Sequence, residues 1–301
     1  MSLGVSRGGF SLNKEKYMKV LVTGVTGQLG YDVMRVLQGR GIDVLGATRK
    51  EMPLDEPAVC RAYIKAQKPD AVIHCAAYTA VDKAEDEPEL CRTINVEATK
   101  AIAKACAECG AKLVYISTDY VFPGTGDAFY EVNDETAPCN VYGASKLDGE
   151  KAVRTALDEH FIVRISWVFG INGKNFIRTM LSLAKNHDAL TVVDDQIGSP
   201  TYTADLAELL CDMVQSDKFG TYHATNEGVC SWYELASETF RQRNTAVKVS
   251  PVPSSAYPTK AVRPHNSRMS KSALDEAGFK RLPAWQDAVT RYLKELEAKG
   301  E

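Results

Sequence analysis

Short apolar runs alternate with segments of helical period over the first 170 or so residues of the chain. The runs are KVLVTG, DVLGATR, DAVIHCAA, KLVYIST and FIVRISWVFG, and the helical segments lie near residues 28–39, 57–67, 88–109 and 140–157. Such alternation with short connections is typical of a parallel sheet covered by helices on both faces. We therefore expect an α/β fold, a Rossmann-type doubly wound parallel sheet, with its ligand at the carboxyl ends of the strands.

Composition excludes several kinds of partner. The net charge of −3 leaves no excess of basic residues to neutralise nucleic-acid phosphates. The sequence contains neither the roughly 18 consecutive apolar residues of a membrane span nor the apolar core of a signal peptide. Its eight cysteines are scattered through apolar segments, as in a reducing compartment. We expect a cytoplasmic protein with no nucleic-acid or membrane partner.

A glycine-rich turn follows the first apolar run. In VTGVTGQLG, three glycines stand where the run passes into the first helical segment. A sharp turn and close approach to a pyrophosphate leave no room for a Cβ, and the N–H groups at the helix start bind the phosphates. We therefore predict a dinucleotide cofactor. The predicted contacts are Gly24, Gly27, Gln28, Leu29 and Gly30, with Ala76 and Ala77 at the end of the third run.

The end of the second run indicates which dinucleotide is bound. An acid here would accept hydrogen bonds from the ribose diol of NAD, but the sequence has Thr48, Arg49 and Lys50. An arginine can hold the extra phosphate of NADPH in a fork, so we predict NADPH. NADH is the alternative if Arg49 and Lys50 are only solvated loop charges. Asp55 is a predicted acceptor for the adenine amine.

The motif NVYGASK places Tyr142 and Lys146 one helical turn apart. Of thirteen tyrosines, only Tyr142 is followed by lysine at this spacing. About one such pair is expected by chance, so its context must decide. The preceding run ends in Ser117 and Thr118, at the sheet edge where the cofactor is expected.

These residues suit the reduction of a carbonyl group. A phenol with a pKa near 10 exchanges protons reluctantly at neutral pH, and a cation one turn away stabilises its phenolate. We expect Tyr142 to protonate the carbonyl oxygen, Thr118 to hold that oxygen, and Lys146 to supply the cation and hold the nicotinamide ribose. The alternative is a surface tyrosine beside a solvated lysine.

The chain of 301 residues exceeds one usual domain. Residues 1–17 are polar and rich in Gly and Ser, which predicts a disordered leader or expression remnant. We expect a dinucleotide-binding Rossmann domain over 18–170. Residues 171–301 are expected to form mainly a smaller substrate-binding lobe, with some segments returning to the first domain. Within the lobe we predict an ordered loop or lid at 249–267 and an amphipathic helix at 284–300.

Several motifs together resemble the extended short-chain dehydrogenase/reductases, and among them the dTDP-4-dehydrorhamnose reductase family. The motifs are GVTGQLG, AAYTAVDKAEDEP, STDYVFPGTGDAFYE, NVYGASKLDGEKAV, RISWVFG, VVDDQIGSPTYTADLAE and AYPTKAVRPHNSRMS, and the resemblance runs from Met18 almost to the C-terminus. It implies NADPH- or NADH-dependent reduction of the 4-keto group of dTDP-6-deoxy-L-lyxo-4-hexulose to dTDP-L-rhamnose. It also implies Thr118, Tyr142 and Lys146 as the catalytic triad.

The resemblance suggests contacts for the substrate as well. Trp167 looks like the residue that packs against the sugar, although an indole there also suits a core. Arg263 is expected to pair with the diphosphate, and Asn175 and Gln196 to contact the nucleotide or sugar. The alternative is that these three satisfy backbone groups in loops.

Some members of the family form dimers around Mg²⁺. The matching acidic positions are Asp32, Asp205 and Glu295, so a homodimer with a structural Mg²⁺ is a further expectation, against the alternative of ordinary helix-surface acids.

Two other functions stay open at this point. Sugar-nucleotide epimerases and dehydratases use the same Tyr and Lys with bound NAD, but the basic end of the second run argues against them. A related branch is a regulatory subunit of methionine adenosyltransferase that binds NADP and a partner protein. The presence of Thr118, Tyr142, Lys146 and Trp167 favours catalysis.

Overall fold

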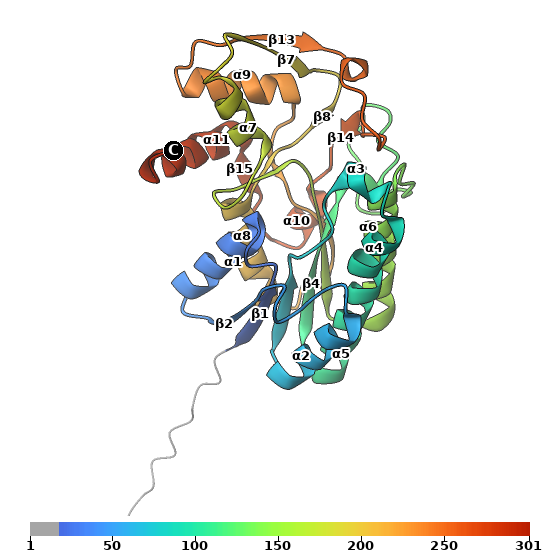
Figure 1. Ribbon diagram of the computed structural model, residues 1–301. Coiled ribbons are helices and arrows are strands. Elements are labelled where there is room, and N and C mark those ends of the chain that lie inside the picture. The colour runs from blue at the N-terminus through green and yellow to red at the C-terminus, as the bar shows by residue number, and fades with distance from the viewer. Residues whose placement is uncertain (1–17) are drawn as a thin grey trace, which may run out of the picture.

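A computed structural model describes residues 18–301, and the predicted leader at 1–17 lies outside the described residues. Six parallel strands form the main sheet in the order β10-β5-β4-β3-β1-β2. They are β1 (Lys19–Thr23), β2 (Asp43–Ala47), β3 (Ala71–His74), β4 (Lys112–Thr118), β5 (His160–Ile165) and β10 (Gly220–His223). The predicted α/β fold with a Rossmann-type parallel sheet is confirmed (Figure 1).

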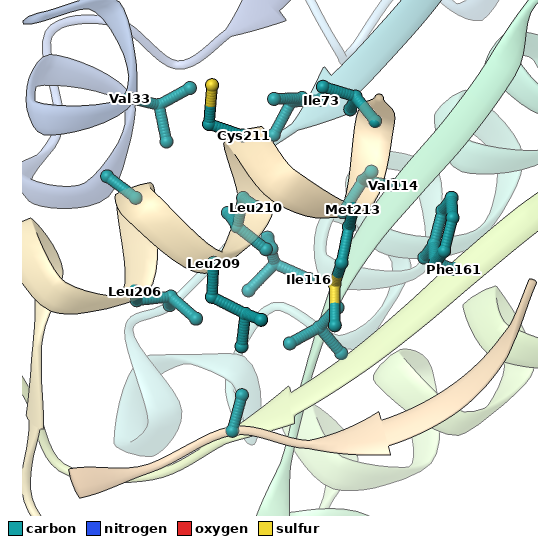
Figure 2. Close-up of a cluster of buried hydrophobic side chains, with 14 of the residues drawn as sticks. Val33, Ile73, Val114, Ile116, Phe161, Leu206, Leu209, Leu210, Cys211 and Met213 are labelled. Carbon is teal, nitrogen blue, oxygen red and sulfur yellow. The ribbon is translucent and has the colours of Figure 1, made fainter. Parts of the chain in front are cut away.

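Helices cover both faces of this sheet. On one side lie α1 (Gln28–Gly39) and α8 (Thr203–Val214), and on the other α2 (Pro57–Gln67), α5 (Ala98–Cys109) and α6 (Val141–Ala156) (Figure 1). Alternate strand residues serve the two faces: Val20 and Val22 pack toward α1 and α8, whereas Leu21 packs toward α2 and α5. Figure 2 shows the first of these cores, with Leu206, Leu210 and Met213 of α8 among the strand side chains. Burial on both faces explains the continuous apolar runs.

Two predicted elements are divided in the structure. The helical segment 88–109 consists of α4 (Pro88–Arg92), a π-helical turn η1 (Thr93–Glu97) and α5. In the turn, the buried Asn95 binds both backbone polar groups of Tyr78. The last apolar run breaks after β5 at Trp167, whose φ is +50°, and continues as β6 (Val168–Phe169), paired with β9 (Thr201–Tyr202).

The rest of the chain builds small sheets above the carboxyl edge of the main sheet. Their strands are β7 (Ala189–Val193), β8 (Ile197–Gly198), β11 (Asn226–Glu227), β12 (Cys230–Ser231), β13 (Lys248–Val252), β14 (Asn266–Ser267) and β15 (Leu282–Ala284). The helices are α3 (Val81–Ala84), α7 (Phe176–Leu183), α9 (Trp232–Gln242), α10 (Ser272–Glu276) and α11 (Trp285–Ala298), with 3-10 turns η2 (Asp119–Val121) and η3 (Ser254–Ala256).

The segment 249–267, predicted as an ordered loop or lid, begins within one strand and ends in another, β14. Residues 248–252 form β13, which pairs with β7. Pro251 fits there because β13 is an edge strand, where a missing N–H is tolerated. The predicted C-terminal amphipathic helix is confirmed as α11, which buries Val289 and Leu293.

After residue 200 the chain returns to the main sheet at three places. One is the segment of α10 and the residues after it, where Leu274 and Phe279 join the core that α1 and α8 cover. Helix α8 packs on α1, and β10 extends the sheet beside β5. Across residues 18–301, no helix combines the length and apolar character that a membrane crossing requires.

Candidate active site

A cavity of about 580 Å³ opens at the carboxyl ends of the strands. It is bordered by the glycine turn, the ends of β2 to β5 and the start of α6. Such a position is where doubly wound folds bind their ligands. Most of the predicted site residues line it: Gly24, Gly27, Gln28, Leu29, Gly30, Arg49, Asp55, Ala76, Ala77, Thr118, Tyr142, Lys146 and Trp167.

The glycine turn has no room for side chains at two positions. Gly24 has a φ of +68°, and a Cβ there would lie 2.9 Å from the backbone of Ala76. A Cβ on Gly30 would lie 2.3 Å from the carbonyl oxygen of Gly24. This packing brings the first turn of α1 against the end of β1, and residues of that turn line the cavity. The start of a helix is where N–H groups can bind phosphate.

Charged side chains stand at the end of β2. The guanidinium of Arg49 is 83 % exposed and forms an ion pair with Asp55 over 2.9 Å. The carboxylate of Asp55, which is predicted to accept from the adenine amine, therefore already has Arg49 as a partner in this structure. An acid that sequence reasoning missed is Glu51, whose carboxylate accepts from both the backbone N–H and the hydroxyl of Thr48, which lowers its pKa. The pattern Thr-x-x-Glu was the available signal.

Tyr142 and Lys146 project from the first turns of α6. The helix begins at Val141 because the side chain of Asn140 accepts from the Gly143 N–H over 2.7 Å. Lys146 is only 3 % exposed, and its ammonium lies 4.0 Å from the centre of the Tyr115 ring.

Burial governs the ionisation of both side chains. It lowers the pKa of Lys146 to about 7, against an opposing effect of the Glu150 carboxylate. Burial also raises the pKa of Tyr142, while a hydrogen bond with Thr118 acts in the opposite direction. Tyr142 is thus protonated at neutral pH, as a proton donor must be.

A buried carboxylate beside Thr118 was not predicted as part of the site. Asp119 accepts from the Thr118 hydroxyl over 2.9 Å and, with its other oxygen, from the Ser267 hydroxyl over 2.5 Å. Burial raises the pKa of Asp119 to about 6, although both hydrogen bonds oppose this. Asp119 therefore links the end of β4 to β14 of the smaller lobe.

A second buried network lies one turn beyond Lys146 on α6. The Glu150 carboxylate accepts from Ser117 over 2.6 Å and from two nitrogens of Arg164 over 2.8 Å each. Burial opposes its ionisation, but Arg164 and Ser117 outweigh that effect, so the pKa of Glu150 is lowered. The network fixes α6 to β4 and β5. The acid four residues after Lys146 was its only sequence signal.

Trp167 borders the cavity in a left-handed backbone conformation. For a residue other than glycine such a conformation costs on the order of 1–3 kcal/mol, and it persists where surrounding bonds hold it. Here Thr201 supplies them: its N–H donates to the Trp167 carbonyl and its hydroxyl to the Ser166 carbonyl. The indole stacks on that of Trp232, with ring centres 3.8 Å apart.

Three predicted substrate residues do not line the cavity. Asn175 caps α7, and its amide nitrogen donates to Gly170 and Tyr292. Gln196 accepts from the indole N–H of Trp232 over 3.2 Å. Asn175 thus satisfies a backbone carbonyl, as the alternative expects, and Gln196 satisfies a side chain; their contact with the nucleotide or sugar stays a prediction.

Arg263 lies just behind the cavity wall. Its guanidinium contacts the phenol of Tyr120, which lines the cavity, over 3.2 Å and pairs with Asp82 over 2.5 Å.

The three acids expected to hold Mg²⁺ are occupied by arginines. Arg35 lies between Asp32 and Glu295, at 3.0 and 2.7 Å, and Arg291 forms a two-pronged pair with Asp205. In residues 18–301 no group of three or more His, Cys, Asp or Glu side chains is arranged to hold a metal ion. Arginines thus neutralise these acids within the single chain, and the Mg²⁺ between subunits stays a prediction.

Comparison with known proteins identifies the family. The model of the family described as RmlD substrate binding domain matches residues 18–298. The chain belongs to the dTDP-4-dehydrorhamnose reductase (RmlD) family. The family resemblance drawn from the motifs is thus confirmed.

Relatives in the RmlD family match almost the whole chain. It is 40% identical over 294 residues to the dTDP-4-dehydrorhamnose reductase of Escherichia coli K12, which covers 93% of this chain and 98% of that protein. A crystal structure of a reductase of this name from Clostridium acetobutylicum has a TM-score of 0.91, 37% identity, and coverage of 93% and 100%. One from Bacillus anthracis, in complex with NADP, has a TM-score of 0.90, 39% identity, and coverage of 93% and 99%.

Proposed function

We propose that this chain is an NAD(P)H-dependent oxidoreductase that reduces the 4-keto group of dTDP-6-deoxy-L-lyxo-4-hexulose (dTDP-4-dehydrorhamnose) to dTDP-L-rhamnose. The observation that carries the proposal is the meeting of Thr118, Tyr142 and Lys146 in the cavity above the glycine turn. Relatives of the chain at about 40% identity are named for this activity.

The residues around the cavity suit a nicotinamide dinucleotide. Gly24 and Gly30 leave the first turn of α1 without side chains that would block a pyrophosphate. Arg49, exposed at the end of β2, is in place to pair with the additional phosphate of NADPH, and the Bacillus anthracis relative was crystallised with NADP. We therefore propose NADPH, with NADH as the alternative cofactor. When bound, the nicotinamide supplies the hydride.

The chain's own residues supply the proton and hold the oxygen. Tyr142 keeps its proton at neutral pH and gives it to the sugar oxygen. The buried ammonium of Lys146 stabilises the phenolate that remains and holds the nicotinamide ribose. Thr118 gives the sugar oxygen a second hydrogen bond.

Two residues are proposed to orient the substrate. The indole of Trp167 borders the cavity and offers a flat apolar surface to the sugar ring. Arg263 is proposed to exchange its partner Asp82 for the diphosphate, because both anions suit the same guanidinium fork. The predicted homodimer, a Mg²⁺ shared between subunits and a cytoplasmic location stay predictions.

The decisive experiment follows the absorbance of NADPH, and then of NADH, after addition of dTDP-6-deoxy-L-lyxo-4-hexulose. We expect oxidation by the wild type and almost none by Tyr142→Phe at equal concentration. Oxidation of neither cofactor, although both bind, would contradict the proposal and would favour the regulatory-subunit function. A cofactor that stays bound in stoichiometric amount through purification would favour an epimerase or dehydratase.

A further inference from the structure

The cavity wall at Trp167 is two aromatic rings thick. The indoles of Trp167 and Trp232 are stacked with their centres 3.8 Å apart and their planes within 15°. Trp167 belongs to the turn between β5 and β6, whereas Trp232 is the first residue of α9 in the smaller lobe. Trp167 lines the cavity and Trp232 does not.

Trp232 is held in place independently of Trp167. Its indole N–H donates to Gln196 over 3.2 Å, and its ring packs against Phe176 with centres 4.7 Å apart. The helix that carries it starts with a reciprocal cap between Ser231 and Glu234. Trp232 is therefore a rigid support rather than a loosely packed side chain.

The surroundings of Trp167 leave its orientation to this support. Thr201 fixes the backbone of Trp167 through a hydrogen bond. Gly198 leaves room for the ring, because a Cβ at position 198 would lie 3.0 Å from the indole. These contacts fix the backbone and leave space beside the ring, which also packs at the border of a core cluster. In residues 18–301 the aromatic ring that stacks on this indole is that of Trp232.

We propose that Trp232 is a positioning residue, which fixes the plane of the Trp167 indole so that the stacked pair, held at its far side by Gln196, orients the sugar ring. This inference rests on the proposed function. It gives Gln196 a role through Trp232 in place of the direct substrate contact predicted from the sequence.

The kinetic test uses Trp232→Leu and Trp232→Phe in the full-length protein. Misplacing a reacting carbonyl by about 1 Å costs up to about 100-fold in rate. We expect Trp232→Leu to lower kcat/KM for the hexulose by about ten- to a hundredfold while the Kd for NADPH stays unchanged. Trp232→Phe, which keeps an aromatic face, should recover part of the loss. The matched control is Trp285→Phe. Trp285 is buried in the core cluster against which the pair packs, but it neither lines the cavity nor belongs to the stack, so its replacement should leave both values unchanged.

Circular dichroism tests the pair without turnover. Two stacked indoles couple their electronic transitions and give a paired positive and negative band. We expect this signal in the wild type and in Trp285→Phe, and its loss in Trp167→Phe and Trp232→Phe. Adding dTDP-L-rhamnose to the wild type with bound NADP should change the signal, because the sugar would rest on Trp167.

The outcomes separate the two proposals. A wild type that oxidises NADPH, together with a folded Trp232→Leu of equal kcat/KM, overturns the positioning role and leaves the function standing. An equal loss of NADPH affinity also overturns it, since general damage then explains the result. A wild type that oxidises no NADPH with the hexulose removes the function, and the inference with it.

Discussion

Thr118 donates its hydroxyl hydrogen bond to the carboxylate of Asp119, 2.9 Å away, inside the cavity where that hydroxyl is proposed to hold the sugar oxygen. A hydroxyl has one proton, so it serves one acceptor at a time. Thr118 can donate to the sugar oxygen only if that oxygen replaces Asp119 as acceptor or if Asp119 itself is protonated. The pKa of Asp119 is raised by burial to about 6, which places the second route within reach of mildly acidic assays.

The raised pKa of Asp119 predicts a pH dependence of stability. The folded chain holds this proton up to about pH 6, whereas the unfolded carboxyl, with its ordinary pKa of 3.8, loses it earlier. The free energy of unfolding should therefore fall as the pH rises from about 4 through 6. Asp119→Asn should remove that part of the slope and be more stable at about pH 8 by on the order of 2 kcal/mol. Urea unfolding at several pH values measures both the slope of the free energy of unfolding with pH and the difference in stability at about pH 8.

The matched control for this experiment is Asp127→Asn, because Asp127 is exposed. It should keep the wild-type slope. An unchanged slope in Asp119→Asn would show that this carboxyl does not titrate as inferred.

Tyr142→Phe removes the proposed proton donor and little else. We expect turnover to fall by about 10²- to 10⁴-fold with the Kd for NADPH nearly unchanged. Stopped-flow turnover and cofactor titration measure the two values. Tyr63→Phe, outside the cavity on α2, is the control and should keep wild-type turnover. A Tyr142→Phe protein of full activity would end the proposed mechanism.

Lys146→Met should make the fold more stable and abolish turnover. The ammonium is buried, which lowers its pKa to about 7, so below that pH the fold must hold an unfavourable charge. Replacing it should raise Tm most below about pH 7, by roughly 2–4 °C for each kcal/mol gained, and less as the pH approaches 10. Turnover should be lost. Calorimetry measures the Tm of Lys146→Met against that of the wild type, with Lys151→Met as the exposed control. A lower Tm for Lys146→Met below about pH 7 would refute the prediction.

Arg49→Ala should weaken the binding of NADPH and leave the binding of NADH unchanged. Loss of a charge-assisted hydrogen bond of about 1.5–3 kcal/mol corresponds to roughly ten- to a hundredfold in the Kd for NADPH. Lys50→Ala is the matched control, since Lys50 is exposed, carries the same charge and does not line the cavity. Fluorescence titration measures the Kd for both cofactors. An equal loss of affinity for NADPH and NADH in Arg49→Ala would contradict the role assigned to Arg49.

The sequence was informative where local patterns decide structure. Apolar periodicity predicted the first five strands of the sheet and their helices, and the cavity brings together Gly24, Thr118 and Tyr142, which lie far apart in the chain. The carboxyl ends of parallel strands share one edge, so this meeting followed from strand order.

Features that depend on distant partners escaped prediction. Burial raises the pKa of Asp119, although Ser267, far along the chain, donates a hydrogen bond that lowers it, and Asp205 acquires its partner Arg291 only in the fold. The left-handed Trp167 depends likewise on Thr201, more than thirty residues later. No local pattern reports such contacts.

The return of the chain to its sheet has a consequence for engineering. A fragment ending near residue 170 would lack β10 beside β5 and would expose the apolar surface that Leu206, Leu210 and Met213 cover. Such a fragment should aggregate, since a strand edge and a core face would both be bare. Sugar specificity therefore cannot be exchanged between relatives as one contiguous cassette. A working chimera must leave the recipient its own α8 and β10, residues 203–223, and also residues 272–282, which pack in the same core.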